Sequence, residues 1–372
     1  MADPRFQQLA EVLVGYSCAL ESGDKVLIDA IDCPEAMVRS LIRAAGAAGA
    51  SPLVSLKNYA LLRDQILLGD EDMMRAMGDH ERHRLEQVQA YIAIRGNPNI
   101  SEWSDIPDEK MALYKRHVFQ HAHLEVRVPK TRWVILRWPS ASMAQQAEMS
   151  TEAFEDFYFK VCTLDYDRMS KAMEPLREMM DATDRVRLVA PGTDLSFSIA
   201  GIPAVPCDGK MNIPDGEVYT APVRDSIQGR IQFNTPTIYY GVTHQDVGLE
   251  FKDGKIVNAW SSDQRHLEAT LDTDEGARYT GEFAIGFNPL INRPMKDILF
   301  DEKIAGSIHL TPGNAYEDAW NGNQSQIHWD LVLRMAPEAG GGEIYFDDRL
   351  IRRDGLFVVP ELEALNPENL LV

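Results

Sequence analysis

The beginning of the chain constrains the fold most, because a strand, a helix and a second strand follow one another there. The apolar runs 25–31 and 52–56 have the length of buried strands, and the helical stretch between them stops at its glycines. Such a βαβ unit implies parallel strands. Apolar runs at 90–96 and 133–139, separated by polar helical stretches, continue the pattern. We therefore predict an α/β domain with an open, mainly parallel sheet over residues 1–184.

The composition changes near Asp184, where a long helical stretch ends and glycine, proline and Asp-Gly turns become frequent. Asp-Gly separates two strand-like runs in LEFKDGKIVNAW, residues 249–260, which is typical of a β-hairpin. Further Asp-Gly turns stand at Asp208-Gly209, Asp215-Gly216 and Asp354-Gly355. We predict that residues 185–372 form a β-rich α+β domain.

Charge and cysteine content exclude several classes of partner and compartment. A formal net charge of −20 argues against nucleic acid and against anionic membrane surfaces, which would repel the chain. The sequence has no signal-peptide pattern and no apolar run approaching about 18 residues. Its four cysteines are scattered without a CxxC pair, so we expect a reduced, cytoplasmic protein.

Five polar residues of the second half have the chemistry of a metal site: Glu217, Glu282, His309, His328 and Asp330. Two imidazoles and three carboxylates suit a pair of divalent cations. His328 and Asp330 are the most informative, because the run around them reads as a strand. Residues two apart on a strand point to the same face, so the pair would project together, away from the residue between them.

Each of these residues also has a simpler interpretation. Glu217 could be an exposed turn glutamate, and His309 could be a hydrogen-bonded core histidine. His328 and Asp330 could bond each other without a metal. Glu282 lies beside an apolar run and needs a compensating partner, which a metal would supply. Spacing alone leaves these alternatives open.

Other motifs are less specific. His117 and His121 are four residues apart on an expected helix, with His123 nearby, and could clamp a zinc ion. No HExxH pattern follows, so we interpret this group as a polar surface patch. The phosphate-binding patterns GxGxxG and GxxxxGK[ST] and the nucleophile pattern GxSxG are absent from the sequence.

Four motifs follow one another in the second half: NIPDGEVYTAP, GEFAIGFNP, ILFDEKIAGSIHLTPGNAY and NQSQIHWDLVL. Their order and spacing resemble the M29 family of metallo-aminopeptidases, of the thermophilic aminopeptidase T type, over most of residues 185–360. The amino-terminal strand and its Ala/Gly-rich helix are similar as well, although less specific. EKIAGSIH replaces the family's alanine- and asparagine-rich run, and GEFAIGFNP replaces the commoner GEVALVP form. These departures bear on substrate preference more than on the metal site.

The resemblance implies a dinuclear metal centre in the second domain. It implies two divalent ions (zinc, cobalt or manganese), short peptides as substrates, and a homodimer whose active sites open onto an interior cavity. Glu282 would bridge the ions or act as a general base, and Tyr316 would donate a hydrogen bond to the oxyanion. The implied metal ligands are Glu217, Glu282, His309, His328 and Asp330.

Two other functions remain open. A related branch of the fold contains non-heme iron(II) dioxygenases that cleave dihydroxypyridine rings with a mononuclear His-His-carboxylate set. All five ligands of the dinuclear type are kept in this chain, which favours the peptidase. A non-catalytic binding protein on the same scaffold would be expected to have lost one or more ligands, and none is lost.

Overall fold

The computed structural model describes residues 3–371, which form two compact units. The first unit runs to Leu164 and takes in Gly209–Pro214, whereas the second comprises Asp165–Asp208 and the chain from Asp215 onward. The predicted boundary after residue 184 falls inside the second unit, because helix α9 (Tyr166–Ala182) belongs to that unit.

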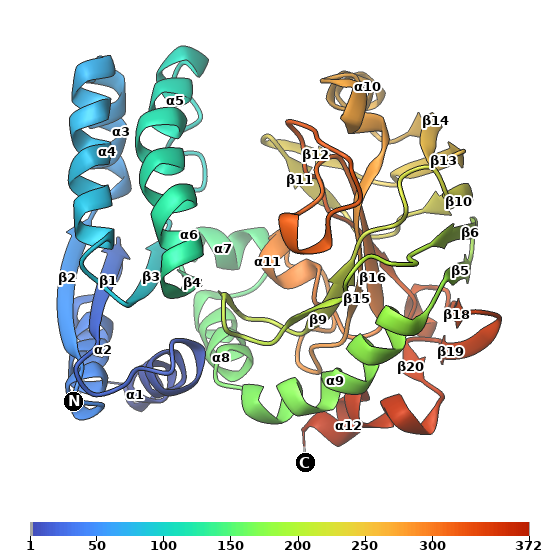
Figure 1. Cartoon of the computed structure of the whole chain (residues 1–372), viewed down its shortest axis with the longest axis horizontal. Helices are drawn as coiled ribbons and strands as arrows, with labels where there is room; N and C mark the ends of the chain where they lie inside the picture. Colours follow the sequence, from blue (N-terminus) through green and yellow to red (C-terminus); the bar gives the residue numbers. More distant parts are fainter. Residues whose placement is uncertain (1–2, 372) are drawn as a thin grey trace. The chain divides into compact units, whose positions relative to one another are not determined.

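A five-stranded sheet in the order β2-β1-β3-β4-β8 forms the first unit (Figure 1). Every pairing in it is parallel, so the predicted open parallel sheet is confirmed. The strands are β1 (Lys25–Ile31), β2 (Ser51–Lys57), β3 (Ala90–Gly96), β4 (Arg132–Trp138) and β8 (Asn212–Ile213).

The helices of the first unit include two π-helices, η1 and η2, among ordinary α-helices. They are α1 (Pro4–Glu11), η1 (Val12–Ser17), α2 (Glu35–Ala47), α3 (Tyr59–Leu68), α4 (Glu71–Leu85), α5 (Asp108–Tyr114), η2 (Lys115–Arg127), α6 (Val128–Lys130), α7 (Ala141–Gln146) and α8 (Thr151–Cys162).

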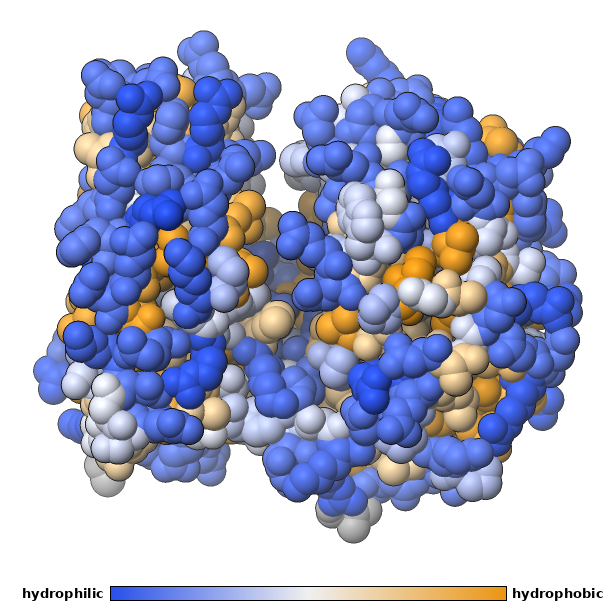
Figure 2. All heavy atoms as spheres, in the orientation of Figure 1, coloured by the Kyte–Doolittle hydropathy of each residue, from blue (hydrophilic) through white to orange (hydrophobic). Residues whose placement is uncertain are grey.

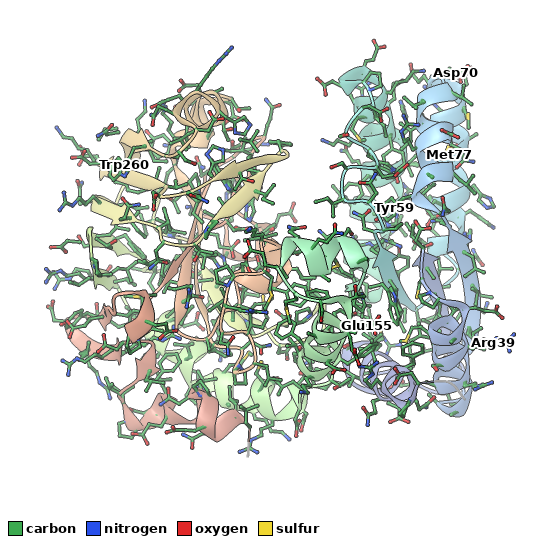
Figure 3. The ribbon with its side chains drawn as sticks, turned by 180° about the vertical axis from the view of Figure 1, so that it is seen from behind. Arg39, Tyr59, Asp70, Met77, Glu155 and Trp260 are labelled. Atoms are coloured by element: carbon green, nitrogen blue, oxygen red, sulfur yellow. The ribbon has the colours of Figure 1, made fainter. Side chains whose placement is uncertain are left out.

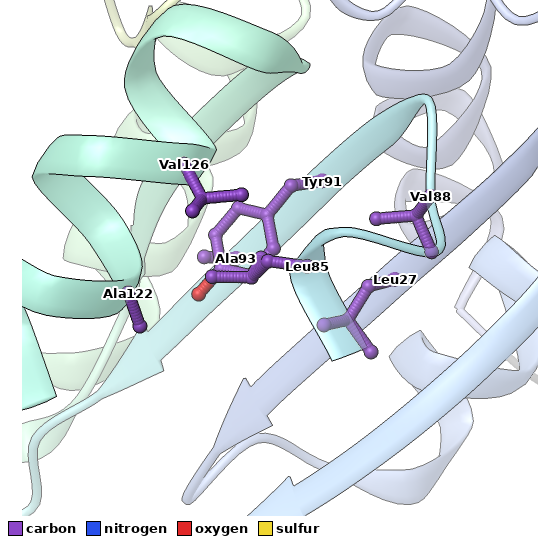
Figure 4. Close-up of a cluster of buried hydrophobic side chains, with 7 residues drawn as sticks. All are labelled: Leu27, Leu85, Val88, Tyr91, Ala93, Ala122 and Val126. Atoms are coloured by element: carbon purple, nitrogen blue, oxygen red, sulfur yellow. The ribbon is translucent and has the colours of Figure 1, made fainter. Parts of the chain in front are cut away.

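A buried apolar cluster packs α4 and η2 against this sheet (Figure 4). Helix α4 approaches η2 closely at Gly78, where a Cβ atom would lie 1.7 Å from the carbonyl oxygen of His117. A larger residue at this position would therefore push the two helices apart. The members of the cluster are Leu27, Leu85, Val88, Tyr91, Ala93, Ala122 and Val126.

An ion cluster is buried at the middle of β1. Asp29, which is 1% exposed, lies 3.0 Å from Lys57 Nζ and 2.9 Å from Arg95 Nη2, and it accepts a hydrogen bond from the Tyr91 hydroxyl. Lys57 Nζ is also 3.1 Å from Glu81 Oε1. Burial acts to raise the pKa of Asp29, but the charges of Arg95 and Lys57 outweigh it and hold that pKa well below its usual range.

The second unit contains two antiparallel sheets and a two-stranded hairpin, β11-β12 (Figure 1). One sheet has eight strands in the order β14-β13-β10-β6-β5-β18-β19-β20, and the other has five in the order β17-β16-β15-β9-β7. The predicted β-rich character of this half is thus confirmed. Figure 2 shows mostly hydrophilic side chains over the face of the molecule in view.

The eight-stranded sheet consists of β5 (Arg185–Ala190), β6 (Thr193–Ser198), β10 (Gln228–Gln232), β13 (Gly248–Lys252), β14 (Lys255–Trp260), β18 (Glu343–Phe346), β19 (Arg349–Arg353) and β20 (Leu356–Phe357). The five-stranded sheet consists of β7 (Val205–Cys207), β9 (Glu217–Thr220), β15 (Thr280–Gly286), β16 (Ser307–Pro312) and β17 (Leu331–Arg334), and the hairpin of β11 (Thr237–Tyr239) and β12 (Val242–His244). Besides α9, the helices are α10 (Gln264–Leu271), η3 (Glu275–Arg278), α11 (Ile298–Asp301), η4 (Glu317–Ala319), η5 (Pro337–Ala339), η6 (Pro360–Leu365) and α12 (Pro367–Leu370).

Aromatic packing and one buried arginine join the two sheets of the second unit. Phe197 on β6 meets Phe283 on β15 edge to face, with their centroids 5.0 Å apart. The guanidinium of Arg352 on β19 is fully buried and donates to the carbonyl oxygens of Ser307 and Gly286, at the ends of β16 and β15. Because buried charged groups need such partners, Arg352 fixes the register of β15 and β16 against the other sheet.

The predicted Asp-Gly hairpin is confirmed. Strands β13 and β14 pair antiparallel, and the turn between them places Asp253 and Gly254 at φ 50° and 77°. Positive φ at both central turn positions is the reason this dipeptide is favoured in hairpins. Within the described residues, no helix is both long and apolar enough to cross a membrane. All four cysteines are free thiols.

The imidazole of His123 on η2 gives the first unit a pH-dependent stability. Arg127 Nε donates to its Nδ1 at 3.3 Å. Burial and the charges of Arg127, Arg95 and Lys57 lower the pKa of His123 to about 3, against a smaller opposing effect of Asp29. The folded-state pKa therefore lies below the unfolded one, so the unfolded chain binds the extra proton and stability falls as pH decreases from about 6.5 toward 3.

We expect His123→Gln, whose amide oxygen can still accept from Arg127, to remove this dependence. Between pH 7 and pH 5 the wild type should lose about 2 kcal/mol more free energy of unfolding than the variant. Urea unfolding at the two pH values measures this difference. His80→Gln, an exposed change on α4, should keep the wild-type dependence. Equal losses in H123Q and wild type would contradict the assignment.

Candidate metal centre

Three adjacent strands, β9, β15 and β16, carry the first three candidate residues (Figure 1). Glu217 begins β9 opposite Gly286 of β15, and His309 on β16 lies opposite Ala284 of β15. Glu282, Ala284 and Gly286 alternate along β15 and share one face. The register therefore directs Glu217, Glu282 and His309 to the same face, over two small residues that leave room for them.

The candidate residues form one connected cluster. His309 Nε2 lies 2.8 Å from Glu282 Oε1, and His309 Nδ1 lies 3.5 Å from Glu217 Oε2. His328 Nε2 is 3.4 Å from Glu282 Oε2 and 3.2 Å from Asp330 Oδ1. Glu282 is thus central, with one oxygen toward each histidine. The structure brings all five candidates together, and their role as metal ligands stays a prediction.

The predicted strand around His328 and Asp330 is wrong in its bounds. Strand β17 begins only at Leu331, and His328 makes an isolated bridge with Gly313. The reason is local hydrogen bonding, because the His328 ring donates from Nδ1 to the carbonyl oxygen of Asn314 at 2.9 Å. This bond ties the segment to the loop at Asn314. Nε2 of the His328 ring still faces the cluster.

Trp329 anchors this segment from the side opposite the cluster. Its ring is 2% exposed and stacks on Tyr239, with centroids 4.7 Å apart and planes 16° from parallel. It also meets His244 at 4.9 Å, and its Nε1 donates to Thr237 Oγ1 at 3.4 Å. These three partners belong to the β11-β12 hairpin, which therefore fixes the two candidate residues flanking Trp329.

The electrostatics of the cluster favour added positive charge. Burial acts to lower the pKa of His309, but the charge of Glu217 and the hydrogen bond to Glu282 outweigh it and raise that pKa. Burial also raises the pKa of the Glu217 carboxyl. For Asp330, the charge of His328 outweighs burial, so the pKa lies below its usual range. Carboxylates that lie this close together attract cations, either protons or metal ions.

The donor atoms fit a divalent cation. Oε2 of Glu217, Oε2 of Glu282 and Nδ1 of His309 are buried and have no hydrogen-bond partner. Orphaned buried polar atoms are costly, and a metal would satisfy them. One donor atom each from Glu282, His309 and Asp330 lie within 4.8 Å of one another. Imidazole and carboxylate ligands suit zinc, cobalt or manganese.

The charged groups beside Glu217 were not predicted from the sequence. Lys303 Nζ lies 3.5 Å from Glu217 Oε1 and 3.8 Å from Asp215 Oδ1, and it contacts Glu302. Donor atoms of Cys207, Asp215 and Glu217 also lie within 4.8 Å of one another. A glutamate and a lysine between the apolar runs ILF and IAG were the available signal, because charges inside apolar sequence must be paired.

Tyr316 lies at the border of the cluster. Its side chain is 47% exposed, and its ring centroid is 4.6 Å from that of His328 and 5.9 Å from that of Tyr219. This position places a phenol next to the candidate metal ligands. The catalytic role predicted for Tyr316 stays a prediction.

The histidines of η2 are not part of this cluster. His121 pairs with Asp79 at 2.9 Å, and His117 lies 3.3 Å from Glu71, as expected of a polar patch. The inclusion of His123 in that surface patch was wrong, because its ring is packed between Tyr91 and Phe119. Helical spacing alone does not reveal which face of a π-helix is covered.

Comparisons with known proteins agree over most of the chain. A family model described as thermophilic metalloprotease (M29) matches residues 2–344. Aminopeptidase T of Thermus thermophilus is 26% identical over 88% of this chain and 91% of its own length. Aminopeptidase 2 of Geobacillus stearothermophilus is 24% identical over 90% of this chain and 92% of its own.

Two solved structures share the fold. Wild-type AmpT from Thermus thermophilus superposes with a TM-score of 0.80 at 22% identity, covering 96% of this chain and 99% of that one. The 2,5-dihydroxypyridine dioxygenase of Pseudomonas putida KT2440 gives a TM-score of 0.61 at 12% identity, covering 96% of this chain and 98% of that one. At sequence identities this low, the TM-scores demonstrate a common fold only. The chemistry has to be argued from the residues of the site.

We expect Trp329→Leu to weaken divalent metal binding about 10- to 100-fold, because the segment flanking Trp329 loses its stacked support. Chelator competition with Zn²⁺ measures the affinity. Trp260→Leu is the matched control, since Trp260, labelled in Figure 3, lies on β14 and donates to Gln232. Equal affinities in the two variants would show that the hairpin does not support the centre.

Proposed function

The chain belongs to the thermophilic metalloprotease (M29) family, and from this premise we propose that it releases amino-terminal residues from short peptides at a dinuclear metal centre. Its class, a metal-dependent aminopeptidase, rests on the family match and on the aminopeptidases that align with about nine-tenths of the chain. The proposal adds the number of ions, the residues that hold them and the size of the peptide.

The ligands we propose are the five clustered residues, with Glu282 at the centre and one of its oxygens directed toward each histidine. One observation carries this assignment: Oε2 of Glu217 and Nδ1 of His309 are buried, lie 3.5 Å apart and have no hydrogen-bond partner. A hydrogen-bonded core would have paired these atoms within the protein. The full set is Glu217, Glu282, His309, His328 and Asp330.

The charge balance supports two ions. The cluster and its surroundings contain five carboxylates and the ammonium of Lys303, which pairs with Asp215, Glu217 and Glu302. The other two carboxylates, Glu282 and Asp330, lie beside the histidines. Two divalent cations would neutralise the four remaining negative charges, whereas one would leave two buried charges uncompensated. The nitrogen and oxygen donors suit zinc, cobalt or manganese, and we propose that the native metal is one of these.

The chain's own groups then have distinct tasks. Bound divalent cations supply Lewis acidity toward the scissile carbonyl and lower the pKa of water. The central Glu282 carboxylate would accept the proton of the attacking water, or would serve as a ligand while another carboxylate does so. The Tyr316 hydroxyl donates a hydrogen bond to the developing oxyanion. An acidic group of the cluster, or a metal held by these residues, would bind the free amino terminus of the peptide.

The dioxygenase alternative has less support. A ring-cleaving iron(II) enzyme needs only a facial triad with open positions. The cluster contains Glu217 and Glu282 in addition to such a triad, and these two glutamates would then have no role as ligands. A homodimer and a preference for short peptides remain part of the proposal, and light scattering of the full chain tests the dimer.

We expect Glu282→Gln to reduce kcat/KM for aminoacyl-nitroanilides at least about 10³-fold, because an amide neither accepts the proton nor matches a carboxylate as a ligand. Hydrolysis rates over a small panel of aminoacyl-nitroanilides measure this loss, with circular dichroism confirming the fold. Glu250→Gln, on the exposed face of β13, should leave the rate unchanged. Near-wild-type turnover in E282Q would remove Glu282 from the mechanism.

Removing the Tyr316 hydroxyl should act on kcat rather than on KM. We expect Tyr316→Phe to lower kcat about 10²-fold with little change in KM, since an oxyanion donor acts only in the transition state. Steady-state kinetics on the same substrates separate the two parameters. Tyr345→Phe on β18 serves as the control for loss of a phenol. A rise in KM alone would make Tyr316 a substrate-binding residue and not an oxyanion donor.

A further inference from the structure

Lys303 is an unusual neighbour for a metal centre, because its ammonium is buried in the same carboxylate cluster. The residue follows helix α11 and is 1% exposed. Its Nζ lies 3.5 Å from Glu217 Oε1 and 3.8 Å from Asp215 Oδ1, and it contacts Glu302. A buried ammonium is tolerated only when it is paired, and here three carboxylates pair with it.

The two oxygens of the Glu217 carboxylate have different neighbours. Its Oε1 faces the ammonium of Lys303, whereas its Oε2 is turned toward His309 and has no hydrogen-bond partner. Three carboxylates pair with the Lys303 ammonium, and an ammonium has no lone pair to offer a metal. Lys303 therefore orients one oxygen of Glu217 and leaves the other free.

The backbone holds Lys303 in this position. Asn288 is fully buried, and its backbone N–H donates to the carbonyl oxygen of Lys303 at 2.9 Å. Its side-chain Nδ2 donates to the carbonyl oxygen of Asp215 at 2.6 Å. A single buried asparagine thus connects the loop that carries the cation to the turn that leads into Glu217. Such a connection fixes the ammonium before any ligand binds.

We infer that the Lys303 ammonium is an internal counter-ion, which pairs with the carboxylates around Glu217 and holds them in place before a divalent cation binds. The inference rests on the proposed function, since it treats Glu217 as a metal ligand. Lys303 is a positioning residue, acting through Glu217 and not on the substrate. It makes the folded state of the second unit less dependent on metal than its carboxylates alone would permit.

Replacement of Lys303 by methionine tests this role, because it removes the charge and keeps most of the volume. In the metal-depleted full chain, Lys303→Met should lower Tm by about 10 °C relative to wild type. Saturating Zn²⁺ should recover more than half of that loss, since divalent charge replaces the missing ammonium. Lys303→Gln, a milder change, serves if the methionine variant is not recovered folded.

Lys57 provides the matched control, as a lysine that pairs with two carboxylates, Asp29 and Glu81, in the first unit. We expect Lys57→Met to lower Tm equally with and without Zn²⁺. The inference is overturned if the Lys303 variants lose no stability in the metal-depleted state. It is also overturned if Zn²⁺ leaves their loss unchanged, as for the control, because Lys303 would then be a purely structural residue.

Metal content, measured on the same samples, separates this inference from the proposed function. Two ions per chain in both wild type and K303M support both. One ion in wild type and two in K303M would overturn the inference, since Lys303 would then occupy the place of a metal ion. Failure of wild type to bind Zn²⁺ would contradict the proposed function, whereas the metal-depleted comparison of Lys303→Met with wild type would still decide whether Lys303 is a counter-ion.

Discussion

The rest of the second unit depends on the burial of like charges in one place. Glu217, Glu282 and Asp330 converge with two histidines on one face of the five-stranded sheet, where solvent cannot screen their repulsion. Such an arrangement is stable only if cations are supplied. Lys303 supplies one from within the chain, and the pKa of His309 is raised because the charge of Glu217 and the hydrogen bond to Glu282 outweigh burial.

The surrounding fold keeps these charges from moving apart. Arg352 fixes β15 and β16 through their carbonyl oxygens, and the contact of Phe197 with Phe283 joins the two sheets behind them. On the other side, the β11-β12 hairpin packs against Trp329. Trp329 stands in the sequence between two of the proposed ligands, His328 and Asp330. Rigid strands and stacked rings therefore oppose the mutual repulsion of the clustered charges, so that the positions of these side chains are set before a metal binds.

The features that could be predicted from the sequence are those with a local signal. Apolar runs alternating with helices predicted the parallel sheet, and Asp253-Gly254 predicted the hairpin. The ordered motifs indicated the M29 resemblance, which the family match confirms. The site residues on β9, β15 and β16 could be named, but their convergence depends on strand pairing between distant segments. The bounds of the His328 segment were missed because a side-chain bond to a loop carbonyl ended the strand early. Lys303 was missed because burial of a lysine depends on carboxylates far away in the sequence.

We propose that this carboxylate cluster holds two divalent cations between β9, β15, β16 and the segment before β17. A crystal of the metal-loaded protein, with diffraction data collected at the absorption edge of the bound metal, tests it most directly. We expect two anomalous peaks per chain, one next to Glu217 and His309 and the other next to His328 and Asp330, with Glu282 in contact with both. A single peak, or peaks away from these five residues, would contradict it.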